Sequence, residues 1–185
     1  PNSRILTFIN EEEGDLKIYF HRITSGETES RNLLYFDKVL DFDYSPNGNR
    51  LVMSAVKNGL TDIYVHTIAS GTNEQITRDV ADDLNPRYIK SADDRIVFSS
   101  NRLNDTLDLP FDPLAKTALT YDLFTYDLEE DNKIAIRLSE GSYIERFQPA
   151  AKTAGKIYYL GDMTGTINKY LAGFDSTIAY IDTTT

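Results

Sequence analysis

The sequence contains no cysteine, no tryptophan and only two histidines among its 185 residues. The lack of cysteine excludes disulfide bridges, thiol catalysis and cysteine-ligated zinc sites. Basic residues are also scarce, because 19 Lys and Arg stand against 29 Asp and Glu, for a formal net charge of −10. Nucleic-acid binding needs clustered Lys and Arg to contact the phosphates. We therefore expect no nucleic acid among the partners.

Long apolar runs are absent as well. No stretch approaches the ~18 residues of a membrane-spanning helix, so we expect no membrane span in this segment. The chain starts at Pro1 without an initiator methionine, which is typical of a piece of a longer protein and leaves a signal peptide an open question. Twelve Tyr and nine Phe favour β-structure, because aromatic side chains suit a half-buried pleated surface.

An internal repeat is the most informative feature that is present. Four apolar segments each begin with a basic residue, at Arg4, Arg50, Arg95 and Lys156. These starts are 46, 45 and 61 residues apart, and the longer last interval is explained by an insertion over residues 103–120. Turn sequences repeat too, since SPNGNR (45–50) is followed 45 or 46 residues later by SADDR (91–95). Pro, Asn and Gly in such a turn preset the backbone for a tight reversal.

Each repeat unit contains four short strands joined by turns, which is typical of a β-propeller blade. We predict an all-β fold, a β-propeller made of four-stranded antiparallel blades, with about four blades and 15 strands that include STIAYID (176–182). The predicted units are residues 1–37, 38–82, 83–141 and 142–185. Because the first unit lacks its first strand, we expect an arc of a larger ring with six or seven blades.

The segment from Leu40 to Arg102 resembles the TolB-like propeller repeat, the PD40 class of WD40-like repeats. The matching motifs are Ser45-Pro46-Asn47-Gly48, Asp62-Ile63-Tyr64, Ile76-Thr77, Asp83-Leu84-Asn85-Pro86 and Ser99-Ser100-Asn101-Arg102. Tyr44 and Tyr88 stand where the family pattern has tryptophan, and the third and fourth units have SADD and AAKTAG in place of SPDG. The resemblance covers most of the chain. These residues build the blade, so they indicate the fold rather than the function.

Motifs that carry catalytic chemistry are not found. The chain has no G-x-S-x-G, G-x-G-x-x-G, P-loop or H-E-x-x-H sequence. His21 and His66 occupy equivalent positions of adjacent units, which a propeller separates by more than ~10 Å. The acidic stretch from Asp127 has Asn132 and Leu138 where a calcium-binding EF-hand needs Gly and Glu. We therefore expect no catalytic residue, no cofactor and no metal in this segment.

The insertion over residues 103–120 is the place where the repeat is interrupted. Its leucine and phenylalanine side chains give it an apolar edge that either folds back on the blade or contacts a partner, and long loops on rigid scaffolds often carry recognition. Both alternatives remain open at the level of the sequence. The candidate partner-binding residues are Arg102, Leu107, Leu109, Phe111 and Leu114.

The resemblance implies a non-enzymatic protein-interaction scaffold in the periplasm or cell envelope of a Gram-negative bacterium, with envelope proteins as partners. One alternative is a propeller that gates access to the catalytic domain of a tricorn-type or prolyl-oligopeptidase-type peptidase, with catalysis elsewhere in the longer protein. Another is a propeller that binds a small ligand or a carbohydrate in its central pore. The sequence does not decide between these three functions.

Overall fold

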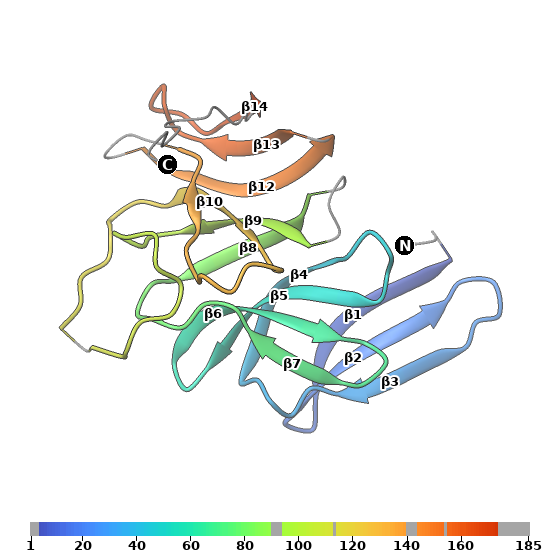
Figure 1. The fold of residues 1–185 in the computed structure, drawn as a ribbon. Coiled ribbons are helices and arrows are strands. Elements are labelled where there is room, and N and C mark those ends of the chain that lie inside the picture. The colour runs from blue at the N-terminus through green and yellow to red at the C-terminus, as the bar shows by residue number, and fades with distance from the viewer. Residues whose placement is uncertain (1–3, 90–93, 113, 140–143, 154, 174–185) are drawn as a thin grey trace, which may run out of the picture.

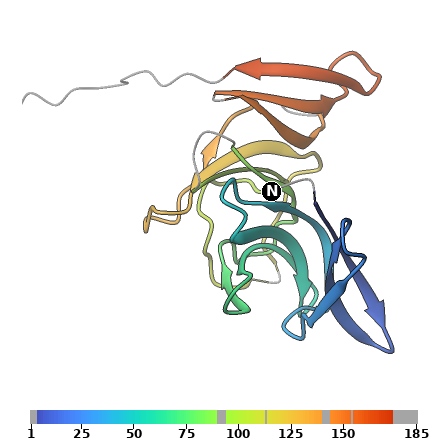
Figure 2. The ribbon, with the colours of Figure 1, turned by 90° about the vertical axis from the view of Figure 1, so that its right-hand side faces the viewer.

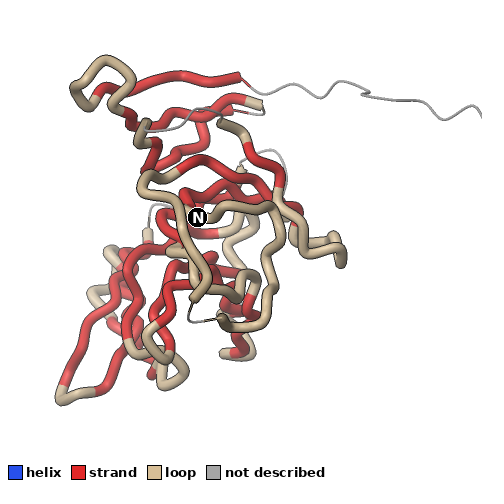
Figure 3. The backbone as a smooth tube through the Cα atoms, turned by 90° about the vertical axis from the view of Figure 1, so that its left-hand side faces the viewer, coloured by secondary structure: helices blue, strands red, loops and turns tan. Residues whose placement is uncertain are grey.

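The computed structural model describes residues 4–89, 94–112, 114–139, 144–153 and 155–173. Within these ranges the chain forms 14 strands and no helix (Figure 3), so the described residues include no helix that could cross a membrane. The strands form four antiparallel sheets, which we number sheet 1 to sheet 4 in chain order. The sheets follow one another from the N-terminal to the C-terminal part (Figures 1 and 2). The predicted all-β architecture of short antiparallel blades is confirmed.

Consecutive strands are neighbours in every sheet. Sheets 1 and 2 consist of β1 (Ile5–Glu12), β2 (Asp15–Arg22) and β3 (Thr28–Asn32), and of β4 (Lys38–Tyr44), β5 (Arg50–Lys57), β6 (Leu60–Thr67) and β7 (Thr72–Gln75). Sheets 3 and 4 consist of β8 (Asp83–Tyr88), β9 (Arg95–Ser100), β10 (Asp122–Asp127) and β11 (Ile136–Arg137), and of β12 (Arg146–Thr153), β13 (Lys156–Gly161) and β14 (Asn168–Gly173).

The repeated turns reverse the chain between strands as their residues predict. The amide of Ser45 donates to the carbonyl of Arg50 at 2.9 Å, and the amide of Gly48 donates to the carbonyl of Ser45 at 2.8 Å. Gly48 has a φ of 75°, which glycine adopts without the steric cost that other residues bear. Ser91 to Asp93 of the second copy of this turn, SADDR, lie outside the described residues, and so does the whole of the predicted strand over residues 176–182.

The strand register defines which residues of different sheets are equivalent. Ser54 of β5 pairs with Ile63 of β6, as Ser99 of β9 pairs with Leu123 of β10. Ile63 and Leu123 therefore occupy equivalent positions, and so do the residues that precede them, Asp62 and Asp122. In the outer strands, Tyr64 pairs with Gln75 and Phe124 pairs with Arg137. In the inner strands, Leu84 pairs with Ser99 and Phe147 pairs with Leu160, which makes Asp83 and Arg146 equivalent.

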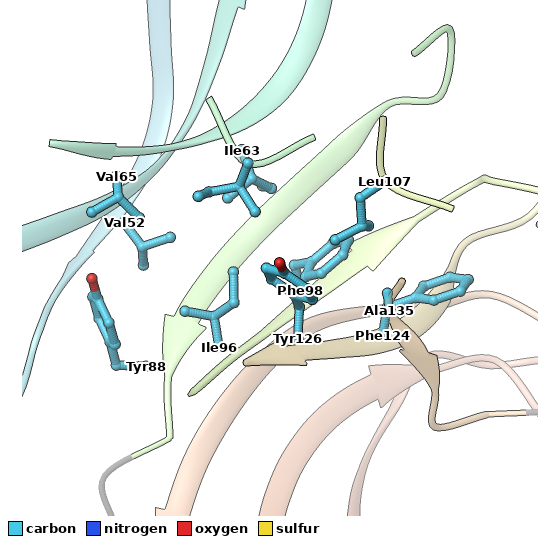
Figure 4. Packing of buried hydrophobic residues seen from close by; sticks show 11 residues of the cluster. Val52, Ile63, Val65, Tyr88, Ile96, Phe98, Leu107, Phe124, Tyr126 and Ala135 are labelled. Atoms are coloured by element: carbon cyan, nitrogen blue, oxygen red, sulfur yellow. The ribbon is translucent and has the colours of Figure 1, made fainter. Parts of the chain in front are cut away.

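Apolar side chains fill the space between adjacent sheets. The cluster between sheets 2 and 3 is shown in Figure 4 and contains Val52, Ile63, Val65, Ile76, Tyr88, Ile96, Phe98, Leu107, Phe124, Tyr126 and Ala135. A second cluster joins sheets 1 and 2, and a third joins sheets 3 and 4. Both faces of a central sheet are thus buried, which is why β5 and β6 carry consecutive apolar residues instead of a strict alternation.

Two outer strands are shorter than the apolar sequences around them. In the stretch SRNLLYF (30–36), β3 ends at Asn32 because Leu33 and Phe36 turn inward into the cluster between sheets 1 and 2. In the stretch KIAIRLS (133–139), β11 covers only Ile136–Arg137. The residues just before β11 instead pair with the insertion, as described next.

Candidate interaction site at the insertion

The first part of the insertion joins the outer edges of sheets 2 and 3. Residues 105–109, which we call the clasp, lie between Arg78 after β7 and the segment before β11, with bridges Arg78↔Asp108 and Thr106↔Ile134. Four backbone hydrogen bonds hold the clasp, two to each sheet. With sheet 2, the amide of Arg78 donates to the carbonyl of Leu107 (2.7 Å) and the amide of Leu109 donates to the carbonyl of Arg78 (2.9 Å). With sheet 3, the amide of Leu107 donates to the carbonyl of Lys133 (2.8 Å) and the amide of Ala135 donates to the carbonyl of Asp105 (2.8 Å). The clasp thus satisfies backbone groups that outer strands usually leave to solvent.

Leu107 anchors the clasp in the core. Its side chain is fully buried and lies among the residues between sheets 2 and 3 (Figure 4). Of the two alternatives for the apolar edge of the insertion, Leu107 follows the first, because its side chain folds back onto the blades. A partner could not touch Leu107 without opening the clasp.

Arg102 is also internal and ties the start of the insertion to the connection between sheets 2 and 3. Its Nη1 donates to Asp79 Oδ2 at 3.1 Å and to the carbonyl of Thr106 at 2.7 Å, and its Nη2 donates to Asp83 Oδ2 at 2.7 Å. Its Nε donates to Ser100 Oγ at 3.0 Å. All four hydrogen bonds are made by one buried guanidinium, so Arg102 holds the insertion against the sheets. Its role as a partner contact remains a prediction.

The remaining predicted contact residues lie at the surface. Leu109 is half-buried, whereas Phe111 and Leu114 have exposed fractions of 63% and 85%. Two further residues that the sequence did not single out, Leu103 and Leu119, are 59% and 88% exposed. The surface-facing set of four, Leu103, Phe111, Leu114 and Leu119, is called the apolar rim below. Its role in contacting a partner remains a prediction.

Two pockets lie on either side of Leu109 and Pro110. The first, of about 250 Å³, is lined by residues of the insertion and of the preceding connection, including Asp79, Arg102 and Lys116. The second, of about 530 Å³, is bounded by Tyr35, Lys57, Asp62, Tyr64, Gln75, Arg78 and Phe111. The insertion therefore forms a ridge with an apolar rim between two hollows.

Asp62 is the acid at this site whose pKa is raised to about 7. Its carboxylate accepts hydrogen bonds from Gln75 Nε2 at 3.1 Å and from Thr77 Oγ1 at 3.4 Å, and its side chain is buried. Burial, reinforced by the negative charges of Asp83 and Asp79, raises the pKa of Asp62 from 3.8 to about 7. Sequence reasoning assigned Asp62 only to the blade motif. The signal that distinguishes it is the comparison with Asp122, which lies at the equivalent place beside two arginines.

The two histidines form equivalent cross-strand hydrogen bonds and do not meet. His21 Nδ1 lies 2.9 Å from Thr28 Oγ1 between β2 and β3, and His66 Nδ1 lies 2.8 Å from Asn73 Oδ1 between β6 and β7. Among the described residues, no group of three or more His, Cys, Asp or Glu side chains is arranged to hold a metal ion. Both histidines belong to the repeated strand pairing.

No protein-family model and no curated protein matches the sequence, but solved structures match the fold. TolB from Acinetobacter baumannii is similar with a TM-score of 0.70 and 17% identity, over 96% of this chain and 40% of that one. A putative TolB from Agrobacterium tumefaciens is similar with a TM-score of 0.72 and 17% identity, over 94% of this chain and 58% of that one. The chain has a TolB-like β-propeller fold.

The TolB-like segment spans 40% and 58% of the lengths of these two TolB chains. A puromycin hydrolase is also similar, with a TM-score of 0.61 and 12% identity, over 87% of this chain and 24% of that one. A structure described as a prolyl endopeptidase is similar with a TM-score of 0.59 and 11% identity, over 93% of this chain and 25% of that one. At these identities the similarities establish the fold alone.

Proposed function

We propose that this TolB-like segment is a non-enzymatic protein-interaction scaffold of the bacterial cell envelope. The observation that carries the proposal is the apolar rim, of which Leu103 lines the first pocket and Phe111 lines the second. Large apolar side chains exposed on one surface segment are typical of contact surfaces. The sequence resemblance to TolB-like repeats implies an envelope location and a protein partner. The similarity to the two TolB structures supports that resemblance at the level of the fold.

The proposed scaffold is part of a larger ring of six or seven blades. β5, β9 and β13 each pair with an inner strand, whereas β1 has no such neighbour among the described residues. Leu6 and Phe8 of β1 are 55% and 41% exposed, although the equivalent Leu51 and Met53 of β5 are fully buried. An inner strand added to sheet 1 would cover the free edge of β1, and a further blade would cover this apolar face.

A crosslinking experiment tests the interaction surface. We would place a photo-crosslinking amino acid at Leu114 of the apolar rim and, as a matched control, at Ser70 in the β6–β7 turn, which is exposed at the other end of the strands. A specific adduct at Leu114 that disappears in a Phe111→Glu, Leu119→Glu double variant supports the proposal. Equal adducts at both positions, or an adduct insensitive to the double variant, would contradict it.

A second candidate is a propeller that filters substrates for a peptidase domain carried by the same longer protein. The similarity to the puromycin hydrolase and the prolyl endopeptidase favours it, because this chain matches about a quarter of each. Measuring hydrolysis of a prolyl-p-nitroanilide peptide by the longer protein separates the two candidates. Hydrolysis whose dependence on peptide length changes when the apolar rim is altered supports the peptidase alternative, and an inactive protein supports the scaffold.

A further inference from the structure

The pocket lined by Asp62 in sheet 2 lies at a position whose equivalent in sheet 3 is occupied by a guanidinium group. In sheet 3, Arg137 of β11 donates from Nη1 to Asp122 Oδ2 at 2.9 Å. Its guanidinium carbon lies 4.8 Å from the centre of the Phe124 ring, within the range of a cation–π contact. Arg146 completes the arrangement by donating from Nη1 to Asp122 Oδ1 at 2.9 Å. Asp122 is thus neutralised by two arginines.

Sheet 2 has the same carboxylate and the same aromatic platform without these cations. Asp62 and Tyr64 correspond to Asp122 and Phe124, but Gln75 stands at the position of Arg137. Asp83 stands at the position of Arg146, so an acid replaces the second arginine. Asp62 forms no ion pair with any described residue, and the pocket of about 530 Å³ is lined by Asp62, Tyr64 and Gln75 themselves.

The charges around Asp62 favour the entry of a cation. Asp79 and Asp83 lie close enough to act on the Asp62 carboxylate, and their shared cation, Arg102, is already engaged by both. The second oxygen of Asp83, Oδ1, is buried and accepts no hydrogen bond from the described residues. One guanidinium, paired with Asp79 and Asp83, therefore stands against three neighbouring acids, and Asp62 is left without a cation among the described residues.

Basic residues at the edge of the pocket do not prevent cation binding. Lys57 lies over the Tyr35 ring, with Nζ 3.0 Å from the ring centre, and Arg78 is paired with Asp108. In sheet 3 the residue at the position of Lys57 is Arg102, and Arg137 binds beside it, donating to its carbonyl at 3.2 Å. Sheet 3 therefore holds the Arg137 guanidinium although it has a basic residue, Arg102, at the position equivalent to Lys57.

We propose that the pocket lined by Asp62, Tyr64 and Gln75 binds an arginine side chain of a partner protein, in the position that Arg137 occupies in sheet 3. The guanidinium donates to the Asp62 carboxylate and lies against the Tyr64 ring, as a bidentate, planar cation is suited to do. This inference rests on the proposed interaction function and specifies one chemical feature of the partner. The apolar rim residue Phe111 borders the same pocket, so apolar contacts adjoin the charged one.

A small probe tests the pocket without knowledge of the partner. We would titrate the intact protein with N-acetylarginine amide and with N-acetylcitrulline amide, which has the same shape but no charge, and follow the Asp62 carboxyl and Tyr64 ring signals by NMR. At pH 8 we expect saturable shifts with the arginine probe and at least tenfold weaker binding of the citrulline probe. At pH 5 we expect about hundredfold weaker binding of arginine, because the Asp62 pKa of about 7 lies two pH units higher.

Three variants complete the test. Asp62→Asn should abolish arginine binding, whereas Glu74→Gln, next to Gln75 on β7, removes an exposed acid of the same charge and should leave binding unchanged. Gln75→Arg should fill the pocket from within, block the probe and raise the unfolding midpoint. Equal binding of the two probes would overturn the inference. So would a Gln75→Arg variant that is stabilised while the unaltered protein binds no arginine probe, because the pocket would then accept only an internal guanidinium.

The outcomes separate this inference from the proposed function. The arginine titration uses no partner protein, so its failure leaves crosslinking through Leu114 untouched. Conversely, loss of a specific adduct at the apolar rim would contradict the scaffold proposal even if the pocket binds the arginine probe.

Discussion

Replacing Asp62 with asparagine should stabilise the protein at alkaline pH. The pKa of this carboxyl is raised from 3.8 to about 7, mainly by burial and further by the charges of Asp83 and Asp79. A difference of about 3 pH units corresponds to about 4 kcal/mol at about 1.4 kcal/mol per unit, which is an upper limit because the cluster can relax. We expect Asp62→Asn to raise the free energy of unfolding at pH 8 by ~2 kcal/mol.

The pH dependence follows from the direction of the shift. Between pH 4 and 7 the folded protein keeps a proton on Asp62 that the unfolded chain has released, with both limits set by the pKa of 3.8 and the raised pKa of about 7. The contribution of Asp62 to stability therefore falls as pH rises through this range and is constant above it. Asparagine does not titrate, so the stabilising effect of the variant should be largest at pH 8 and nearly absent at pH 4.

Asp122→Asn is the matched control, since Asp122 occupies the equivalent position. It pairs with Arg137 and Arg146, and removing one partner of a largely buried ion pair costs about 3–5 kcal/mol. The two substitutions should therefore have opposite signs. Urea unfolding followed by far-UV circular dichroism measures both, because the chain has no tryptophan. Destabilisation of the same sign in both variants at pH 8 would refute the reasoning.

Three other substitutions test the clasp and the turns by the same unfolding measurement. Leu107→Ala should cost about 2–5 kcal/mol because Leu107 is fully buried, whereas Leu114→Ala, at an 85% exposed position, should cost almost nothing; equal effects would contradict the anchoring role. Arg102→Met should cost about 3–5 kcal/mol and speed hydrogen exchange of the clasp amides, and unchanged exchange would contradict its link to the clasp. Gly59→Ala should cost about 1 kcal/mol or more, because Gly59 has a φ of 80°, while Gly173→Ala, where a Cβ meets nothing closer than 3.8 Å, serves as its control.

The blade architecture was predictable because it depends on local chemistry repeated at a constant interval. The turn residues Asn58 and Gly59 both have positive φ, as do Glu13 and Gly14 45 residues earlier, and such a pair specifies a two-residue hairpin. The apolar side chains of the strands between these turns are buried by packing against the neighbouring sheet. Turn chemistry and strand spacing are properties of short segments, so reading them requires no knowledge of distant contacts.

The fate of the insertion was not predictable in the same way. Leu107 and Phe111 are both large apolar residues of one irregular segment, yet Leu107 is buried and Phe111 is 63% exposed. The difference arises because Arg78 and the stretch 133–135 offer backbone hydrogen-bonding groups to residues 105–109 and not to the residues that follow. These edges come from two different sheets, and their meeting is a tertiary event.

The contrast between Asp62 and Asp122 shows how far the repeat itself can extend the reasoning. Both acids begin the same strand motif, Asp-Ile-Tyr and Asp-Leu-Phe, so local sequence assigns them the same role. Their environments differ because the outer-strand partner is Gln75 in one sheet and Arg137 in the other. Once the register makes these positions equivalent, the chain contains an occupied example of a site whose copy lacks its cation. A repeat protein can therefore indicate a binding site by the place where one unit departs from the charge pairing of its neighbour.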